Sequence, residues 1–348
     1  MALGGRQLQH EGTCRSEATS GKVRSYRRLF LSSMGAVYFC AFATYYLQYP
    51  GILGADGLLP AHQYWKQVRK SRWKMLQMDK PLYLDLNIPL AWWTKGLLGS
   101  QTELAKLEIA APGKNKELRG FLDFPSLLWF LDEKMSSLST DQVLEGLALL
   151  GMILSAMSVL GIHNILIFVA LYVNYLSLFL LGQRWLGFQW DIFLLETGAM
   201  MLLYCPLLSI RSFGEVPPVA WLLRVLIAKF MYMNGVVKIT ANCPTWKHLT
   251  ALEYHFASTC LPTPEAWSFH QLPPVILRLA VAFMFVVELA GPFLLLVPIL
   301  AIRRVGVVFQ AALQVGIIVT GNYNWFNFHT IVLLIPAWAD DDYGDARG

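Results

Sequence analysis

The most regular feature of the chain is a succession of apolar runs, each close to the length that crosses a bilayer. A transmembrane helix needs about 20 predominantly apolar residues. The first run covers residues 29–48, and the others follow in a block over residues 144–340. We expect spans in that block at 144–161, 164–181, 186–205, 219–239, 275–296, 305–320 and, shorter than the rest, 326–338. The pattern predicts an all-α polytopic transmembrane helical bundle with about 7–8 spans.

The composition agrees with a membrane protein. The chain is 55% hydrophobic and 15% charged, whereas soluble domains contain about 25% charged residues. The net charge of +5 comes from basic residues in flanks and loops, where they orient membrane helices, so we predict a lipid bilayer and no nucleic acid as partner. The five cysteines form no CxxC or zinc pattern, and we predict no metal and no cofactor.

The segment before the first run is polar and basic. Residues 1–28 are expected to be a disordered basic cytosolic tail, and 29–48 the first transmembrane helix, which places the N-terminus in the cytosol. A cleaved signal peptide is the alternative, with Ala41-Phe42-Ala43 as a cleavage site. The long polar lead and the long apolar run favour a retained signal anchor.

Residues 49–143 contain no full span and are predicted to form a lumenal or interfacial loop. Two aromatic stretches, Pro81–Gly99 and Phe121–Leu131, are too short to span and are expected to lie on the membrane surface. Between them Gln101–Arg119 is polar and lysine-rich, typical of a solvated helix or a mobile insert. The chain ends with an acidic tail over residues 341–348.

Charged residues within the predicted spans are the main functional signal. An ionisable group in a membrane helix costs roughly 2.5–3.5 kcal/mol on insertion scales and therefore needs a partner. We predict a Glu196–Lys229 ion pair, with Asp191 hydrogen bonded nearer the lumen and Glu288 as a second partner for Lys229 or Arg224. The full set is an intramembrane charge network of Asp191, Glu196, Arg224, Lys229, Lys238 and Glu288. Such a network either fixes helix register or forms a buried acid/base site.

The loop over residues 241–274 carries the most distinctive polar residues outside the spans. We predict one short helix over Trp246–Phe256, which would place His248 and His255 on about the same face, beside Tyr254. They could exchange protons or pack as aromatic interface residues. Cys243 and Cys260 could form a disulfide if this loop faces the secretory lumen, worth roughly 3 kcal/mol.

A second polar turn, predicted at another lumenal helix end, contains Asn322, Asn324 and Asn327. Amide side chains at such a place either cap the following helix or line a polar cavity.

Four stretches of the chain carry a family resemblance. They are QYPGILGADGLLPA after the first run, FQWDIFLLETG, NGVVKITANCPTWKHLTALEYHFASTCLPTPEAW and TGNYNWFNFHT. Together they resemble the lipase maturation factor family over roughly residues 29–340, except around Lys66–Arg119. The resemblance implies a multi-pass protein of the endoplasmic reticulum membrane that assists folding and export of secreted lipases such as lipoprotein lipase, with no catalytic residue. Family members continue past Trp338 into a lumenal domain implicated in client contact, so we expect this chain to be a shorter form.

The leading hypothesis is therefore a chaperone-like maturation factor whose lumenal loops 49–143 and 241–274 meet clients or other folding factors. The alternative is a membrane enzyme, remotely similar to vitamin K-dependent carboxylase, that uses Glu196, Lys229 and His255 as acid/base groups. A channel or carrier is a weaker third class because the spans show no inverted repeat.

Overall fold

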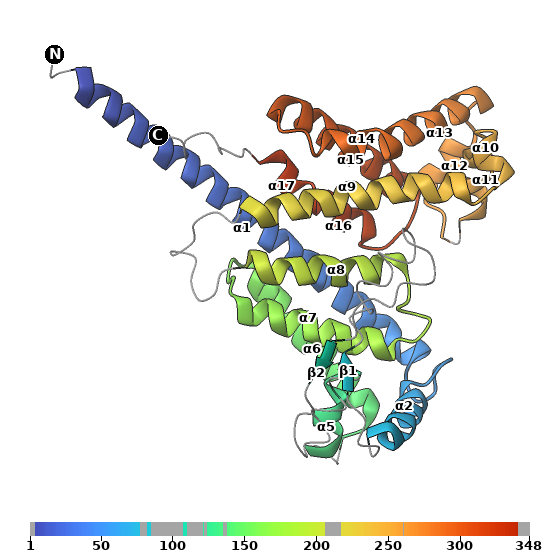
Figure 1. The fold of residues 1–348 in the computed structure, drawn as a ribbon. Helices are drawn as coiled ribbons and strands as arrows, with labels where there is room; N and C mark the ends of the chain where they lie inside the picture. Colours follow the sequence, from blue (N-terminus) through green and yellow to red (C-terminus); the bar gives the residue numbers. More distant parts are fainter. Residues whose placement is uncertain are drawn as a thin grey trace. The chain divides into compact units, whose positions relative to one another are not determined.

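The computed structural model describes residues 4–76, 82–84, 107–109, 121, 124–134, 138–205, 217–259 and 261–339 (Figure 1). The chain divides into two compact units, which are described separately. Unit 1 comprises Met1–Val37 with Ile210–Gly348, and unit 2 comprises Tyr38–Ser209. Helices dominate both units in the part that the structure describes.

Helix α1 (Gly4–Ile52) is a single long helix that contributes to both units. It includes the predicted first span but begins much earlier, so the predicted disordered tail over residues 1–28 is wrong from Gly4 onwards. The physical reason is that helix propagation costs far less than nucleation. Once the apolar run is helical, a preceding stretch without proline can extend the helix toward the N-terminus.

The centre of unit 2 is formed by α6 (Thr140–Val159), α7 (Ile165–Leu181) and α8 (Gln189–Tyr204), close to the predicted bounds. The α6 N-terminus has a capping box, in which Ser139 accepts from Gln142 and the Gln142 side chain accepts from Ser139. Asn164 caps α7 by accepting from the Ile167 amide. Gly161, with a φ of 91°, allows the tight turn between α6 and α7.

The core of unit 2 is aromatic where α1 meets these helices. Tyr175 contacts Phe42 edge-on at a ring-centroid distance of 5.5 Å and Tyr38 at 6.1 Å. All three side chains are buried. Gly198 lies against Tyr38 and Tyr172, where a side chain on α8 would collide with both rings. A large ring on α1 therefore packs directly against the α8 backbone.

Unit 2 also contains short elements inside the predicted loop. These are α2 (Ala61–Leu76), α5 (Leu128–Lys134) and an antiparallel pair of strands, β1 (Leu82–Leu84) with β2 (Leu107–Ile109). In Figure 1, α2 and α5 lie together below α6 and α7. The sequence pattern did not predict α2, and β2 shows that Gln101–Arg119 is not one helix. Most of the predicted surface segment Pro81–Gly99 lies outside the described residues.

Unit 1 is built on α9 (Pro217–Thr240), α13 (Pro274–Leu289) and α15 (Leu300–Thr320), with α16 (Phe326–Val332) and α17 (Ile335–Trp338) packed beside α15. The predicted span 275–296 is interrupted. Helix α13 ends at Leu289, and α14 (Gly291–Leu294) begins with a proline at its second position. Pro292 cannot donate to the preceding turn, which ends the regular helix here.

Three short helices join α9 to α13: α10 (Pro244–Lys247), α11 (Ala251–Ser258) and α12 (Pro264–His270). We call these three helices the cap. The predicted single helix Trp246–Phe256 is wrong, because the chain leaves the helical path between α10 and α11. Leu249 adopts a positive φ of 60°, a conformation outside the helical region.

Length and apolarity identify four helical segments that could each cross a membrane, or five if the bent pair α12–α13 is one span, among the described residues. The four are Tyr26–Ile52, Thr140–Val159, Pro218–Thr240 and Leu300–Thr320. Two shorter apolar segments, Ile165–Leu181 and Phe326–Trp338, accompany them. The chain is therefore a polytopic helical membrane protein, while the count of 7–8 spans stays a prediction.

Candidate functional site

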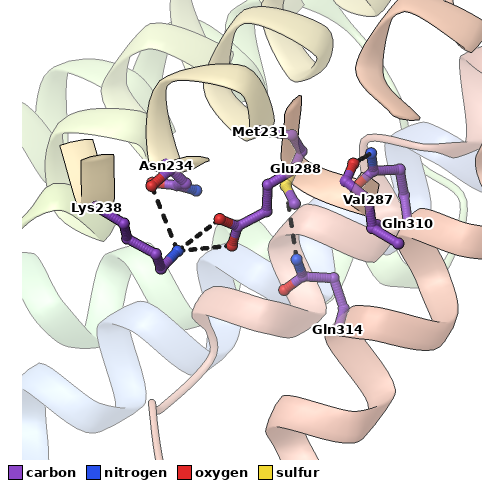
Figure 2. Close-up of polar contacts among 7 residues, drawn as sticks. All are labelled: Met231, Asn234, Lys238, Val287, Glu288, Gln310 and Gln314. Carbon is purple, nitrogen blue, oxygen red and sulfur yellow. Dashed lines mark hydrogen bonds and ion pairs between the residues drawn. The ribbon is translucent and has the colours of Figure 1, made fainter. Parts of the chain in front are cut away.

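Unit 1 contains an ion pair between Lys238 of α9 and Glu288 of α13 (Figure 2). The Lys238 Nζ atom lies 2.7 Å from each Glu288 carboxylate oxygen and 3.3 Å from the Asn234 carbonyl oxygen. The Glu288 side chain is 4% exposed and that of Lys238 is 22% exposed. The ammonium group therefore satisfies the carboxylate and still reaches the edge of the unit.

The backbone places these two residues together by a close approach of α9 and α13. A Cβ atom on Gly235 would lie 2.8 Å from the Leu289 side chain and 3.1 Å from the Glu288 Cβ atom. One turn earlier on α9, Tyr232 contacts Phe293 at a ring-centroid distance of 5.5 Å. The two helices are thus antiparallel, and the last turn of α9 meets the last turn of α13.

This register corrects the predicted partner of Glu288. Glu288 was predicted to be a second partner for Lys229 or Arg224, but the structure pairs it with Lys238. The first turns of α13 extend beyond the end of α9 and lie beside the cap, where Arg278 pairs with Glu253 of α11 at 2.9 Å. The offset between the helices therefore determines the pairing.

Two glutamines of α15 lie beside the ion pair, one helical turn apart (Figure 2). Gln310 donates to the Val287 carbonyl oxygen at 2.7 Å, and the Gln314 amide lies 3.6 Å from the Met231 sulfur. Both glutamines are buried. Because α13 ends at Leu289, its last carbonyl groups lack hydrogen-bond donors within the helix. The Gln310 side chain provides such a donor for the Val287 carbonyl group.

The cap covers the outer side of Lys238. The Lys238 Nζ atom lies 5.6 Å from the centre of the Trp246 ring in α10, within the range of a cation–π contact. Trp246 in turn packs edge-on against Phe285 of α13 at 6.1 Å. The same lysine therefore joins α9, α13 and α10, so the ion pair fastens the cap to the helices below it.

His255 of α11 is a titratable cap residue on which the charge of Lys238 acts. Its Nε2 atom lies 2.8 Å from the Tyr323 hydroxyl, and the two rings are nearly parallel at 7°. Burial first, and the positive charge of Lys238 second, lower the pKa of His255 below its ordinary value of 6.5. The neutral imidazole is therefore favoured in the folded protein.

The other predicted cap residues do not join His255. His248 follows α10 and is exposed, so it does not share a helical face with His255 as predicted. Tyr254 is also exposed. Cys243 is a free thiol that contacts the Thr245 hydroxyl at 3.0 Å; this bond, with backbone amides, lowers the pKa of Cys243. Cys260 lies outside the described residues, so their disulfide stays a prediction.

The polar turn before α16 is only partly as predicted. Asn322 and Asn324 are exposed and Asn327 is buried. The N-cap of α16 is Trp325, whose own side chain makes no capping hydrogen bond, and capping of this helix end by the asparagine side chains stays a prediction. Asn324 has a positive φ of 55°, a conformation that asparagine tolerates better than most residues.

Two predicted intramembrane residues have partners that the sequence did not reveal. In unit 2, Asp191 is buried and accepts a hydrogen bond from the Tyr175 hydroxyl at 2.7 Å. In unit 1, Arg224 donates to the Pro336 carbonyl oxygen at 2.9 Å. Glu196 lies in unit 2 and Lys229 in unit 1, both half-buried, and their pairing stays a prediction.

Arg303 was missed because it was expected in a loop. It lies in the first turn of α15, is buried, and donates to the carbonyl oxygens of Ala337 and Ala339 at 2.8 and 2.7 Å. Arg224 and Arg303 thus both bind carbonyl groups of α17 or its C-terminal end, where cations are favourable. In the described part of the chain, no group of three or more His, Cys, Asp or Glu residues could hold a metal ion.

Comparison of the sequence with known proteins identifies the family of the chain. The sequence model of the lipase maturation factor transmembrane domain matches residues 25–92 and 83–344, in two overlapping parts. The chain belongs to the lipase maturation factor family. Lipase maturation factor 2 of Gallus gallus is 36% identical over 332 residues, 93% of this chain, and that of Homo sapiens is 36% identical over 331 residues, 91% of this chain.

The family extends to a more distant relative. Lipase maturation factor 1 of Bos taurus is 28% identical over 326 residues, which cover 91% of this chain and 49% of that protein. The chain spans about 40% of the length of the lipase maturation factor 2 proteins it matches. No solved structure matches the chain.

Proposed function

We propose that the chain assists the folding and export of secreted lipases of the lipoprotein lipase type, as a chaperone-like factor of the endoplasmic reticulum membrane with a cytosolic N-terminus. The observation that carries this proposal is the similarity to lipase maturation factor 2, which extends over 93% of the chain. The matched residues include the spans, the ion pair and the cap. The membrane helices would act as a scaffold, and the cap would face the lumen.

The site geometry supports a scaffold better than a catalytic centre. In the Lys238–Glu288 pair, both carboxylate oxygens already accept from the ammonium group. An acid/base catalyst needs a group that can reach a substrate proton, whereas here the carboxylate is 4% exposed and its charge is matched. The pair therefore holds α9, α13 and the cap in register.

The cap also presents apolar side chains outward. Trp267 of α12 is 70% exposed, Phe269 of the same helix is exposed as well, and so is Leu261 in the connection before α12. Large exposed apolar groups at one place are typical of a contact surface. We propose that this surface meets the partly folded lipase or another folding factor in the lumen.

Secretion from cells lacking the protein tests the proposal. We expect the activity of secreted lipase per unit of lipase protein to fall in such cells, to recover when this chain is expressed, and the secretion of an unrelated protein to stay constant. Unaltered lipase activity in the deficient cells would refute the proposed function.

The cap surface has its own test in the same cells. Trp267→Ala should restore less lipase activity than the wild-type chain at equal abundance, because it removes the most exposed cap aromatic. Trp185→Ala, which truncates an exposed tryptophan of unit 2, is the matched control and should restore full activity. Equal activity of the two variants would refute the proposed role of the cap surface.

A further inference from the structure

Helix α2 of unit 2 has a fixed place at one end of three membrane helices. It follows α1 after eight connecting residues. That connection is fastened at two points, since the Ala55 amide donates to the Asp141 carboxylate at 2.7 Å and the Gln183 side chain donates to the Leu59 carbonyl oxygen at 3.2 Å. Asp141 lies in the first turn of α6, and Gln183 follows the end of α7. The helix therefore starts where α1 and α7 end and α6 begins.

The apolar face of α2 is already occupied by protein. Ala61, Trp65 and Val68 recur at helical spacing and are buried. Trp65 packs edge-on against Trp129 at a ring-centroid distance of 4.9 Å and also contacts Phe124. An amphipathic helix that binds a bilayer usually inserts its apolar face, so α2 can meet the membrane only through its outward polar face.

That outward face is basic. The 16 residues of α2 include five lysines and arginines and no aspartate or glutamate. Lys66, Arg69 and Lys70 are exposed, and Arg72 and Lys74 follow in the sequence. Two acidic residues of the α6 N-terminal turns have other contacts, because Asp141 accepts from Ala55 and Glu145 from Tyr46.

We propose that the basic face of α2 binds the phosphate-bearing headgroups of anionic lipids in the membrane that α1, α6 and α7 cross. Charge complementarity and position both favour this partner. Lysine and arginine side chains at the ends of spans lie at headgroup level, where anionic lipids attract them. The proposal concerns unit 2 alone and does not depend on the role in lipase maturation.

The test measures which lipids accompany the intact protein. The chain is reconstituted into nanodiscs of phosphatidylcholine with a minor fraction of phosphatidylinositol, and native mass spectrometry counts the lipids that stay bound. We expect enrichment of phosphatidylinositol over its share of the disc, declining with added salt. Lys66→Glu with Lys70→Glu should reduce that enrichment by roughly 30-fold, because each lysine near the membrane surface contributes attraction worth about fivefold.

Two controls make the result specific to this face. Lys247→Glu reverses an exposed lysine of α10 in unit 1 and should leave the enrichment unchanged, as should Gln63→Ala with Gln67→Ala on α2 itself. If the charge reversals impair folding, Lys66→Gln with Lys70→Gln serves instead. Equal enrichment in wild type and lysine variants would overturn the proposal. The proposal would also be overturned if the wild-type protein bound an acidic polypeptide in discs without anionic lipid but enriched no anionic lipid in the discs that contain it.

Discussion

Units 1 and 2 accommodate buried acidic groups in different ways. In unit 1, Glu288 of α13 faces a lysine whose ammonium group contacts both carboxylate oxygens. In unit 2, Asp191 of α8 is also buried, but its described side-chain donor is the neutral hydroxyl of Tyr175. In unit 1 opposite charges pair near an edge, whereas in unit 2 neutral groups donate to the carboxylate within an aromatic core.

The difference follows from where each group lies. Lys238 keeps 22% of its side chain exposed, so its charge is partly hydrated while it neutralises Glu288. Tyr175, which donates to Asp191, is instead surrounded by the rings of Tyr38 and Phe42 on α1. Removing one partner should therefore cost more in unit 1 than in unit 2, because it leaves a full charge without its counter-charge.

The largest expected effect comes from Lys238→Met. The substitution leaves Glu288 buried without its cation, and we expect the free energy of unfolding to fall by about 3 kcal/mol, the lower end for a broken buried ion pair. Chemical denaturation of the purified protein in detergent measures the change in the free energy of unfolding.

The double variant Lys238→Met with Glu288→Leu is the control for that effect. Replacing both charges by apolar side chains is often neutral or stabilising, so most of the lost stability should return, and the double-mutant cycle isolates the pair. A double variant as unstable as the sum of both single variants would show that the two charges do not act on each other.

Tyr175→Phe is expected to have an intermediate effect. It removes the hydroxyl that donates to Asp191 and keeps the ring that packs on Phe42. Loss of one donor to a buried acceptor costs about 1–3 kcal/mol. The same unfolding measurement applies, and Tyr172→Phe, in the same helix, is the control. A loss larger than that of Lys238→Met would reverse the comparison between the units.

The smallest effect concerns the pH dependence of stability. Because the pKa of His255 is lowered in the folded protein, the unfolded chain takes up a proton at a higher pH than the folded one. The contribution is fully present above the unfolded pKa of about 6.5 and declines as the pH falls from there toward the lower folded pKa. His255→Gln should flatten the loss of thermal stability between neutral and mildly acidic pH. An unchanged profile would mean that other groups dominate this range.

The sequence pattern predicted most of the membrane helices and little of what joins them. Apolar runs gave α6, α7, α9 and α15 to within a few residues, since a span is defined by length and hydropathy. Helix α2 was missed because its apolar face is narrow, with Ala61, Trp65 and Val68 among many polar residues. The split between α10 and α11 depends on the backbone of Leu249, which no hydropathy pattern encodes.

The partner of Glu288 could not be predicted, for a separate reason. Counting residues from the helix ends gives the depth of a side chain only if neighbouring helices are level, and α13 is offset so that Glu288 meets Lys238. The donor to Asp191 and the acceptors for Arg303 could not be predicted from charge, because they are a neutral tyrosine hydroxyl and backbone carbonyl groups. Apart from Arg303, the need of these charged residues for partners could be predicted, but the contacts described here could not.

We propose that the Lys238–Glu288 charges hold the cap in place, within the maturation role proposed above, and do not act as acid/base catalysts. The most direct test measures secreted lipase activity in cells lacking the endogenous protein and supplied with wild type, Lys238→Met, or Lys238→Met with Glu288→Leu. The account predicts that the single variant loses activity together with stability and that the double variant recovers both. A double variant that is folded and as abundant as wild type, yet inactive, would contradict it.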